Sequence, residues 1–176
     1  MLGIIDYQHI MADVFTGIKN IQSLLISNDL AGGLRQHNVS IPLLVKVTFL
    51  KILDWDFYFD FDCLQYLLAH CVVLEFFALT GSIFKGHPTI NCSLQQSPPT
   101  CLLFHLKTIE IWSHRMEVEA YMKIVEFFLK NAVVLEDVEV FTGRIPPEHQ
   151  LKIMRELLML PSVSKECRVF LNTSNC

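Results

Sequence analysis

The stretches CVVLEFFALTG, residues 71–81, and AVVLEDVEVFTG, residues 132–143, share the pattern of apolar and acidic positions that decides the fold. Each follows an amphipathic run, LQYLLAH before the first and MKIVEFFLKN before the second. Each also leads into a short apolar stretch with alternation, which is typical of a strand. The two stretches therefore indicate two copies of one unit, in which a helix precedes a strand.

The same spacing of apolar residues occurs five times along the chain. It is found in IQSLLI, LKILDW, LEFFAL, LKTIEI and LEDVEV, which start at Ile21, Leu50, Leu74, Leu106 and Leu135. Starts about 24 to 32 residues apart indicate a leucine-rich-repeat period, and such units bury an apolar layer only when neighbours stack on them. We therefore predict an α/β fold, a short horseshoe-shaped solenoid like that of leucine-rich repeats. Its parallel strands would line the concave face and its helices the convex face.

Two apolar stripes at helical spacing predict helices behind the strands. We expect all of their residues to pack in the core: Val118, Tyr121, Met122, Val125, Phe128 and Leu129 in the first stripe, and Leu151, Met154, Leu157 and Leu158 in the second. Pro146 and Pro147 stand where the second helix would start, and Pro161 where it would end. The stretch CRVFL, residues 167–171, could then form a last short strand.

Composition and charge restrict the classes of function. The chain of 176 residues is 52% hydrophobic and 18% charged, which indicates a globular protein. Its formal net charge of -4 provides no basic field for a nucleic-acid backbone, so no nucleic acid is expected as a partner. The N-terminal MLGIIDYQHI does not resemble a signal peptide. We therefore expect an intracellular protein, in the cytoplasm or nucleus and not secreted, with six reduced cysteines.

Residues 63–84 are long and apolar enough to suggest a membrane span. However, Gln65, His70 and Glu75 would then lie near the bilayer centre, where a carboxylate costs about 2.5 to 3.5 kcal/mol. The related stretch around residues 122–143 carries many charges and is plainly soluble. We therefore predict a helix and a strand here, and no membrane partner.

Catalysis has weak support in the sequence. The candidate pairs of nucleophile and base are Cys63 or Cys71 with His70, and Cys101 with His105. Cys71 corresponds to an alanine in the second copy of the repeat, so we expect it to be a small buried residue. No sequence motif of a hydrolase, a phosphate-binding loop or a dinucleotide site is present. We predict that the protein is not an enzyme, with a small cysteine-dependent hydrolase as an alternative.

Metal binding is also weakly supported. The cysteines lack the C-x-x-C spacing with which two thiolates hold one zinc ion. The acidic stretch DWDFYFDFD, residues 54–62, suggests a calcium loop, but Phe59 and Gln65 stand where such a loop requires Gly and Glu. We predict no metal and no cofactor, with a metal-binding protein as an alternative.

The second half of the chain resembles the FBD domain of plant F-box/LRR proteins. The stretches CLLFHLKTIEI (101–111), KNAVVLEDVEV (130–140) and LLMLPSVSKECRVFL (157–171) are similar to its three successive signatures. The match rests on Cys101, His105, Leu106, Lys107, Asn131, Ala132, Leu135, Glu136, Pro161, Ser164 and Cys167. Ser162 departs from the family, which usually has a basic residue there.

The resemblance implies an order of domains. Degenerate leucine-rich repeats would occupy residues 1–84, followed by a Pro/Ser/Gln-rich loop at 85–100. An FBD domain at 101–171 would continue the repeat stack, and residues 172–176 would form a tail. We also expect the N-terminal run of residues 2–15 to be a poor cap for the stack, because terminal repeats need a polar outer face.

The function that the resemblance implies is a protein-interaction module. In full-length relatives an F-box docks on the Skp-type adaptor of a cullin-RING ubiquitin ligase, and the repeats are thought to select the protein to be ubiquitinated. This sequence contains no stretch that matches an F-box. We therefore expect the substrate-recognition part alone, with an unknown protein ligand and no binding to a Skp-type adaptor. A truncated, non-functional product is a further alternative.

The repeat register predicts where a partner would bind. Side chains alternate along a strand, so the residue between the last two apolar positions of each repeat should point to the concave face. These residues are Leu25, Asp54, Ala78, Glu110 and Glu139. Three of the five are acidic, which favours a basic patch on the partner. The plainer interpretation is that any solvated sheet face is polar.

Overall fold

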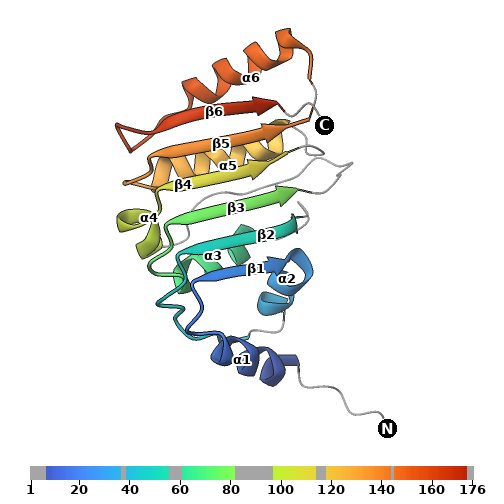
Figure 1. Ribbon diagram of the computed structural model, residues 1–176, viewed down its shortest axis with the longest axis vertical. Coiled ribbons are helices and arrows are strands. Elements are labelled where there is room, and N and C mark those ends of the chain that lie inside the picture. Colours follow the sequence, from blue (N-terminus) through green and yellow to red (C-terminus); the bar gives the residue numbers. More distant parts are fainter. Residues whose placement is uncertain are drawn as a thin grey trace.

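The structure is a computed structural model that describes residues 7–36, 39–55, 61–81, 97–113, 118–143 and 145–173. Six strands pair in parallel and in sequence order to form one sheet (Figure 1). They are β1 Ser23–Ser27, β2 Phe49–Trp55, β3 Phe76–Gly81, β4 Thr108–Trp112, β5 Asp137–Thr142 and β6 Arg168–Thr173. The predicted α/β class is confirmed, as is a last strand close to residues 167–171.

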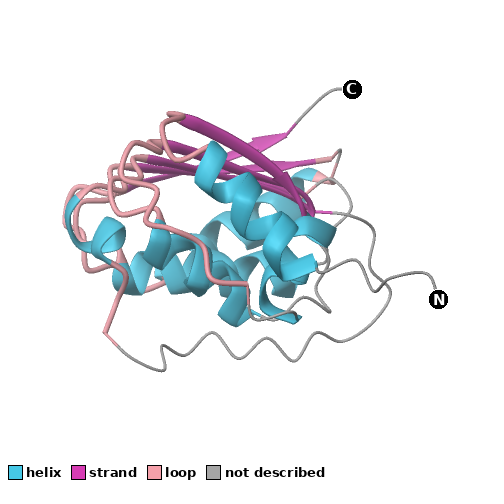
Figure 2. Ribbon diagram, turned by 90° about the horizontal axis from the view of Figure 1, so that it is seen from below, coloured by secondary structure: helices cyan, strands magenta, loops and turns pink. Residues whose placement is uncertain are grey.

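The helices gather on one side of this sheet (Figure 2). They are α1 Tyr7–Gly17, α2 Asn28–Gln36, α3 Phe61–His70, α4 Thr100–Phe104, α5 Val118–Asn131 and α6 Pro147–Met159. The physical reason is that connections between parallel strands are right-handed, so strands added in one direction place every crossover on the same side. The other side, which we call the helix-free face, bears no helix of the described residues.

The strands are joined by a hydrogen-bond pattern that repeats from unit to unit. The carbonyl oxygens of Gln22, Thr48, Glu75 and Lys107 each accept two consecutive backbone N–H groups from the start of the next unit, at 2.8 to 3.1 Å. Each of these residues directly follows the first apolar residue of its repeat, provided that the second repeat starts at Val47. The pattern therefore marks the same position in successive units and sets their register.

The predicted register of the second repeat is wrong. The row of paired, inward-facing residues is Leu24, Leu50, Phe77, Ile109, Val138 and Val169. The second unit is therefore VTFLKI, which starts at Val47, and not LKILDW, which starts three residues later. Pairing between β2 and β3 shifts between Ile52 and Trp55, where Asp54 has a φ of 54°. This bulge inserts one residue, so that Ile52 and Trp55 are both buried on the helix side.

One apolar core lies between the sheet and the helices. Most of the α5 stripe is confirmed, since Tyr121, Val125, Phe128 and Leu129 are buried, while Val118 is exposed. The α6 stripe is largely wrong. Leu151 and Leu158 are exposed and Leu157 is buried, together with Ile153 from outside the predicted stripe. The reason is positional, because among the described residues α6 has a neighbouring helix, α5, on one side only.

At the other end of the sheet, α1 covers the core beside β1 (Figure 1). Its Met11 and Phe15 are buried in the core. Ile10 and Val14 of the same helix are exposed, so its outer face is partly apolar, as expected of a poor cap. The predicted loop at 85–100 falls mainly on residues outside the described part of the chain. Within the part that is described, no helix combines the length and apolar character needed to cross a membrane.

Candidate functional site

Three rows of side chains cross the helix-free face, because alternate residues of every strand point to it. The first row is Ser23, Phe49, Phe76, Thr108, Asp137 and Arg168. The middle row is Leu25, Lys51, Ala78, Glu110, Glu139 and Phe170. The third row includes Thr80, Trp112, Phe141 and Asn172 on β3 to β6. Aromatic, charged and small residues thus share the face, and several aromatic or charged residues are direct neighbours in a row.

The structure brings four of the five predicted site residues into the middle row. They are Leu25, Ala78, Glu110 and Glu139, and Ala78 is almost completely covered by its neighbours. Asp54 is not in the row, because the corrected register puts Lys51 there and leaves Asp54 at the bulge. The repeat spacing also fits a second unit that starts at Val47, and that choice would have predicted Lys51 as the row residue. That these residues bind a partner stays a prediction.

Two stacked aromatic pairs lie on this face, and sequence reasoning missed both. The rings of Phe49 and Phe76 stack with centroids 4.9 Å apart and planes at 12°. Trp112 and Phe141 stack at 4.2 Å and 9°. All four side chains are only partly buried. Aromatic side chains at partly exposed positions are enriched in protein interfaces, because they provide large contact areas at a small entropy cost.

The two central carboxylates of the face are neighbours in register on β4 and β5. Glu110 Oε2 accepts a hydrogen bond from Trp112 Nε1 at 3.0 Å, and Glu139 Oε2 accepts one from Asn172 Nδ2 at 3.3 Å. Among the residues that the structure describes, neither carboxylate forms an ion pair. Two like charges on adjacent strands repel each other, so this part of the face is electrostatically suited to a cation.

The face already holds two cations of its own, each against an aromatic ring. Lys51 Nζ lies 5.6 Å from the centroid of the Trp112 ring. Arg168 binds the Asp137 carboxylate through two atoms, Nε to Oδ1 at 2.8 Å and a terminal nitrogen to Oδ2 at 2.9 Å. The Arg168 guanidinium carbon also lies 5.7 Å from the ring centroid of Phe170. Both contacts are typical cation–π arrangements.

The cysteines offer no support for a nucleophile. Burial raises the pKa of the Cys71 and Cys101 thiols from 9.0 to about 12, whereas a catalytic cysteine needs a lowered pKa. Cys63 donates to the carbonyl oxygen of Ala31 at 2.8 Å, and Cys101 to that of Leu68 at 3.3 Å. The geometry assigns these thiols to helix packing. The prediction that Cys71 is a small buried residue is confirmed.

Of the histidines in the candidate pairs, His70 makes its contacts with Tyr66. His70 Nδ1 lies 2.8 Å from the carbonyl oxygen of Tyr66, and its ring packs on the Tyr66 ring at 4.3 Å. No group of three or more His, Cys, Asp or Glu side chains within the described ranges could hold a metal ion. Asp56 to Asp60 of the acidic stretch lie outside those ranges.

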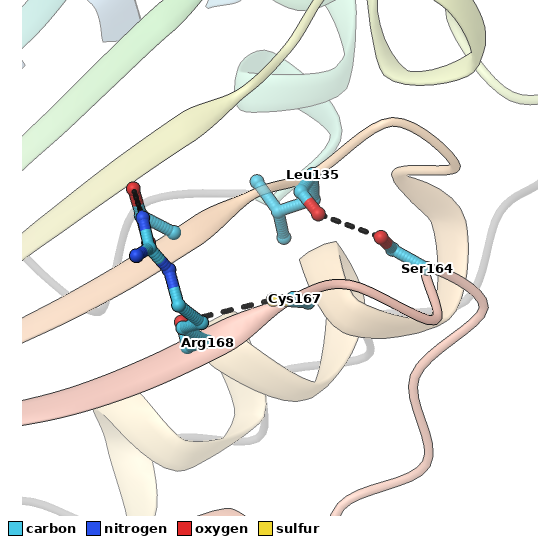
Figure 3. Close-up of polar contacts among 5 residues, drawn as sticks. Leu135, Ser164, Cys167 and Arg168 are labelled. Atoms are coloured by element: carbon cyan, nitrogen blue, oxygen red, sulfur yellow. Dashed lines mark hydrogen bonds and ion pairs between the residues drawn. The ribbon is translucent and has the colours of Figure 1, made fainter.

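The residues that carry the family resemblance hold neighbouring units together. Ser164 Oγ donates to the carbonyl oxygen of Leu135 at 2.6 Å, and Figure 3 shows this contact beside Cys167 and Arg168. The side-chain amide of Asn131 donates to the carbonyl oxygen of Phe127 at 2.7 Å near the end of α5. None of these signature side chains belongs to the three rows of the helix-free face. These side chains therefore support the scaffold, although the signature stretches also contain residues of the rows, among them Glu110 and Glu139.

A single parallel sheet in sequence order, alternating with helices on one side, defines an α/β protein built from stacked strand–helix units. The FBD family model matches residues 95–140. An F-box/FBD/LRR-repeat protein of Arabidopsis thaliana is 31% identical over 110 residues, covering 62% of this chain and 24% of the relative. An FBD-associated F-box protein of the same plant is 25% identical over 168 residues, covering 93% of this chain and 35% of the relative. Residues 95–140 thus match the FBD family, and most of the chain is similar to F-box/FBD/LRR-repeat proteins of plants.

The similarity extends over more than the FBD match. Another F-box/FBD/LRR-repeat protein of Arabidopsis thaliana is 21% identical over 168 residues, or 94% of this chain and 35% of the relative. The chain thus spans about a quarter to a third of the length of these curated relatives. No solved structure matches the chain.

Proposed function

We propose that this chain is a protein-interaction module that binds its partner on the helix-free face. The observation that carries the proposal is the composition of that face, where two stacked aromatic pairs flank a row of charged and small side chains. Interfaces owe much of their binding energy to such aromatic anchors. The names of the relatives, which include F-box and LRR-repeat, support a role in protein interaction.

We further propose that the units form a short solenoid of the leucine-rich-repeat type, with the helix-free face as its concave side. Sequential parallel strands with all helices on one side support this arrangement, because the two layers differ in width and a stack of them bends toward the narrower strand layer. A curved sheet would wrap around part of its partner.

More specifically, we propose that the chain is the substrate-recognition part of an F-box ubiquitin-ligase adaptor. The family supports this role, since relatives of this name carry an F-box as well as repeats. In this proposal the helix-free face contacts the protein that is to be ubiquitinated. The buried, high-pKa thiols and the absence of metal clusters among the described residues give no comparable support to a hydrolase or a metal-binding protein.

A matched pair of variants tests the face. Leu25 and Phe170 lie at the two ends of the middle row, and we would change both to Glu. The control changes Leu43 and Leu158 to Glu, which are exposed apolar residues outside the sheet. Leu25 and Leu43 have almost equal exposure, 57% and 56%, so both pairs add charge to accessible apolar sites.

The readout is affinity capture from plant extract, compared by quantitative mass spectrometry. We expect proteins captured by the wild type and by the Leu43→Glu/Leu158→Glu control to be lost with Leu25→Glu/Phe170→Glu. Circular dichroism of all three proteins would show that the sheet is retained. Equal capture by the two double variants would rule out the helix-free face as the binding surface.

A further inference from the structure

We propose that the Glu110–Glu139 pair on the helix-free face binds the guanidinium group of an arginine from a basic segment of a partner protein. This inference rests on the proposed function, because it specifies the chemistry of the partner at the same face. The two carboxylates and the Trp112 and Phe141 rings beside them make up the site, which we call the central acidic site.

The first argument is electrostatic. Glu110 and Glu139 are paired in register on adjacent strands, whose axes are about 4.8 Å apart. Their hydrogen-bond donors, the indole of Trp112 and the amide of Asn172, are both neutral, so neither cancels a negative charge. A cation between the two carboxylates would remove their mutual repulsion and gain two charge-assisted hydrogen bonds.

The second argument is the contact that Arg168 makes with a carboxylate and an aromatic ring on the same face. One strand further on, Arg168 binds the Asp137 carboxylate through two nitrogens and lies over the Phe170 ring. The central acidic site repeats that combination of a carboxylate next to an aromatic surface, but among the described residues neither of its two carboxylates forms an ion pair with a guanidinium. The molecule therefore contains a related contact, in which a guanidinium binds one carboxylate of the same face.

The third argument concerns the choice of cation. Lys51 Nζ already lies near the Trp112 ring, so a compact ammonium group is present at one side of the site. Lys51 forms no ion pair with Glu110 or Glu139. A planar guanidinium carries five N–H donors in a fixed fork, so it can bind two carboxylates through separate nitrogens, whereas an ammonium acts as a point charge. The geometry thus favours arginine over lysine.

Other kinds of partner fit less well. Phosphate groups of nucleic acids or lipids would meet two uncompensated carboxylates at the middle of the face, and the chain has a formal net charge of -4. A purely apolar helix would bury both carboxylates without a counter-charge, which is costly. A basic, extended protein segment satisfies the charges and can also contact the aromatic pairs.

The test is an NMR titration of the ¹⁵N-labelled full chain. Its two tryptophans supply two indole N–H signals, one from buried Trp55 and one from Trp112 on the helix-free face. The probe is the blocked peptide Gly-Arg-Gly-Arg-Gly, and the control peptide has citrulline in place of both arginines. Citrulline keeps the shape and the hydrogen-bonding N–H groups but has no charge, so the difference between the peptides reports on the guanidinium charge.

We expect the arginine peptide to shift the Trp112 indole signal and to leave the Trp55 signal in place, with a much weaker response to the citrulline peptide. Glu110→Gln and Glu139→Gln should each weaken binding by about tenfold. Glu126→Gln, which removes a carboxylate from α5 on the other side of the sheet, should have no effect. An unchanged Trp55 signal in each variant would show that the core is intact.

Two results would overturn the inference: an equal response to both peptides, or arginine binding that neither glutamine variant weakens. These results are separate from a failure of the proposed function. If Leu25→Glu/Phe170→Glu abolishes partner capture but the arginine peptide does not bind, the face binds a partner by other chemistry. If the peptide binds as expected but capture does not depend on the face, the proposed function fails and the arginine site stands.

Discussion

The two faces of the sheet differ sharply although they are built from alternate residues of the same strands. On the helix side, Phe77, Ile109 and Val138 are completely buried. On the helix-free face, their neighbours Phe76, Glu110 and Glu139 are partly exposed and make polar or aromatic contacts. The difference shows that one face is buried against the helices, whereas the other is the face to which we assign a partner.

The signature residues that make side-chain contacts help to maintain the fold. The serine, asparagine and cysteine residues of the signature hold helix ends and neighbouring units in place through backbone carbonyl groups. These contacts belong to the scaffold on the helix side and to the ends of the strands. In the function that we propose, the partner is bound by the rows on the opposite face.

The largest expected effect is the loss of a buried ring on the helix side. Phe77→Ala should lower the free energy of unfolding by about 3 to 5 kcal/mol, because Phe77 is fully buried and packs on Phe128 at 5.2 Å between ring centroids. Urea denaturation followed by circular dichroism would measure the change.

The matched control is the adjacent residue on the other face. Phe76→Ala removes the same atoms from a partly exposed position, so we expect a loss of no more than about 1.5 kcal/mol. Equal losses in the two variants would contradict the view that only the helix side maintains the fold.

An intermediate effect is expected from the thiols behind the sheet at alkaline pH. Burial raises the pKa of the Cys71 thiol from 9.0 to about 12, so the folded state keeps a proton that the unfolded chain releases. The stabilisation is complete below pH 9 and is lost as the pH rises towards 12. At pH 10 the unfolded state gains on the order of 1 kcal/mol from ionisation of this thiol.

Cys71→Ala isolates this contribution, because alanine occupies the corresponding position, Ala132, in the later repeat. Between pH 7 and pH 10 the wild type should lose on the order of 1 kcal/mol more unfolding free energy than the variant. Urea denaturation at both pH values would give the four free energies. Parallel losses would mean that the folded protein lets this thiol ionise.

The smallest effect is expected from aromatic stacking on the helix-free face. A double-mutant cycle of Phe49→Leu and Phe76→Leu should give a coupling energy of about 0.5 to 1.5 kcal/mol, since the rings stack at 4.9 Å. Urea denaturation of the two single variants and the double variant provides the cycle. A coupling near zero would make these rings independent, and therefore free to reorient against a partner.

The sequence predicted the register of a strand correctly where its apolar residues fit the repeat spacing in only one frame. In LEFFAL, LKTIEI and LEDVEV a single frame puts three apolar residues on the helix side, and all three strands have that register. It failed at α6, where Leu151 and Leu158 satisfy helical spacing but find no layer to pack against among the described residues. Periodicity identifies an apolar stripe, while burial also requires a neighbour.

The sequence by itself determined the repeat, the parallel order of the strands and the family, because each depends on apolar spacing or on matched residues along one chain. Only the tertiary structure decided the register of β2, since frames starting at Val47 and Leu50 both satisfy the spacing. Pairing with β1 and β3 selects the first frame, and the bulge at Asp54 returns Trp55 to the core. That choice puts Lys51 on the helix-free face and removes Asp54 from it. A residue's place on such a face depends on its strand partners, and these are distant in sequence.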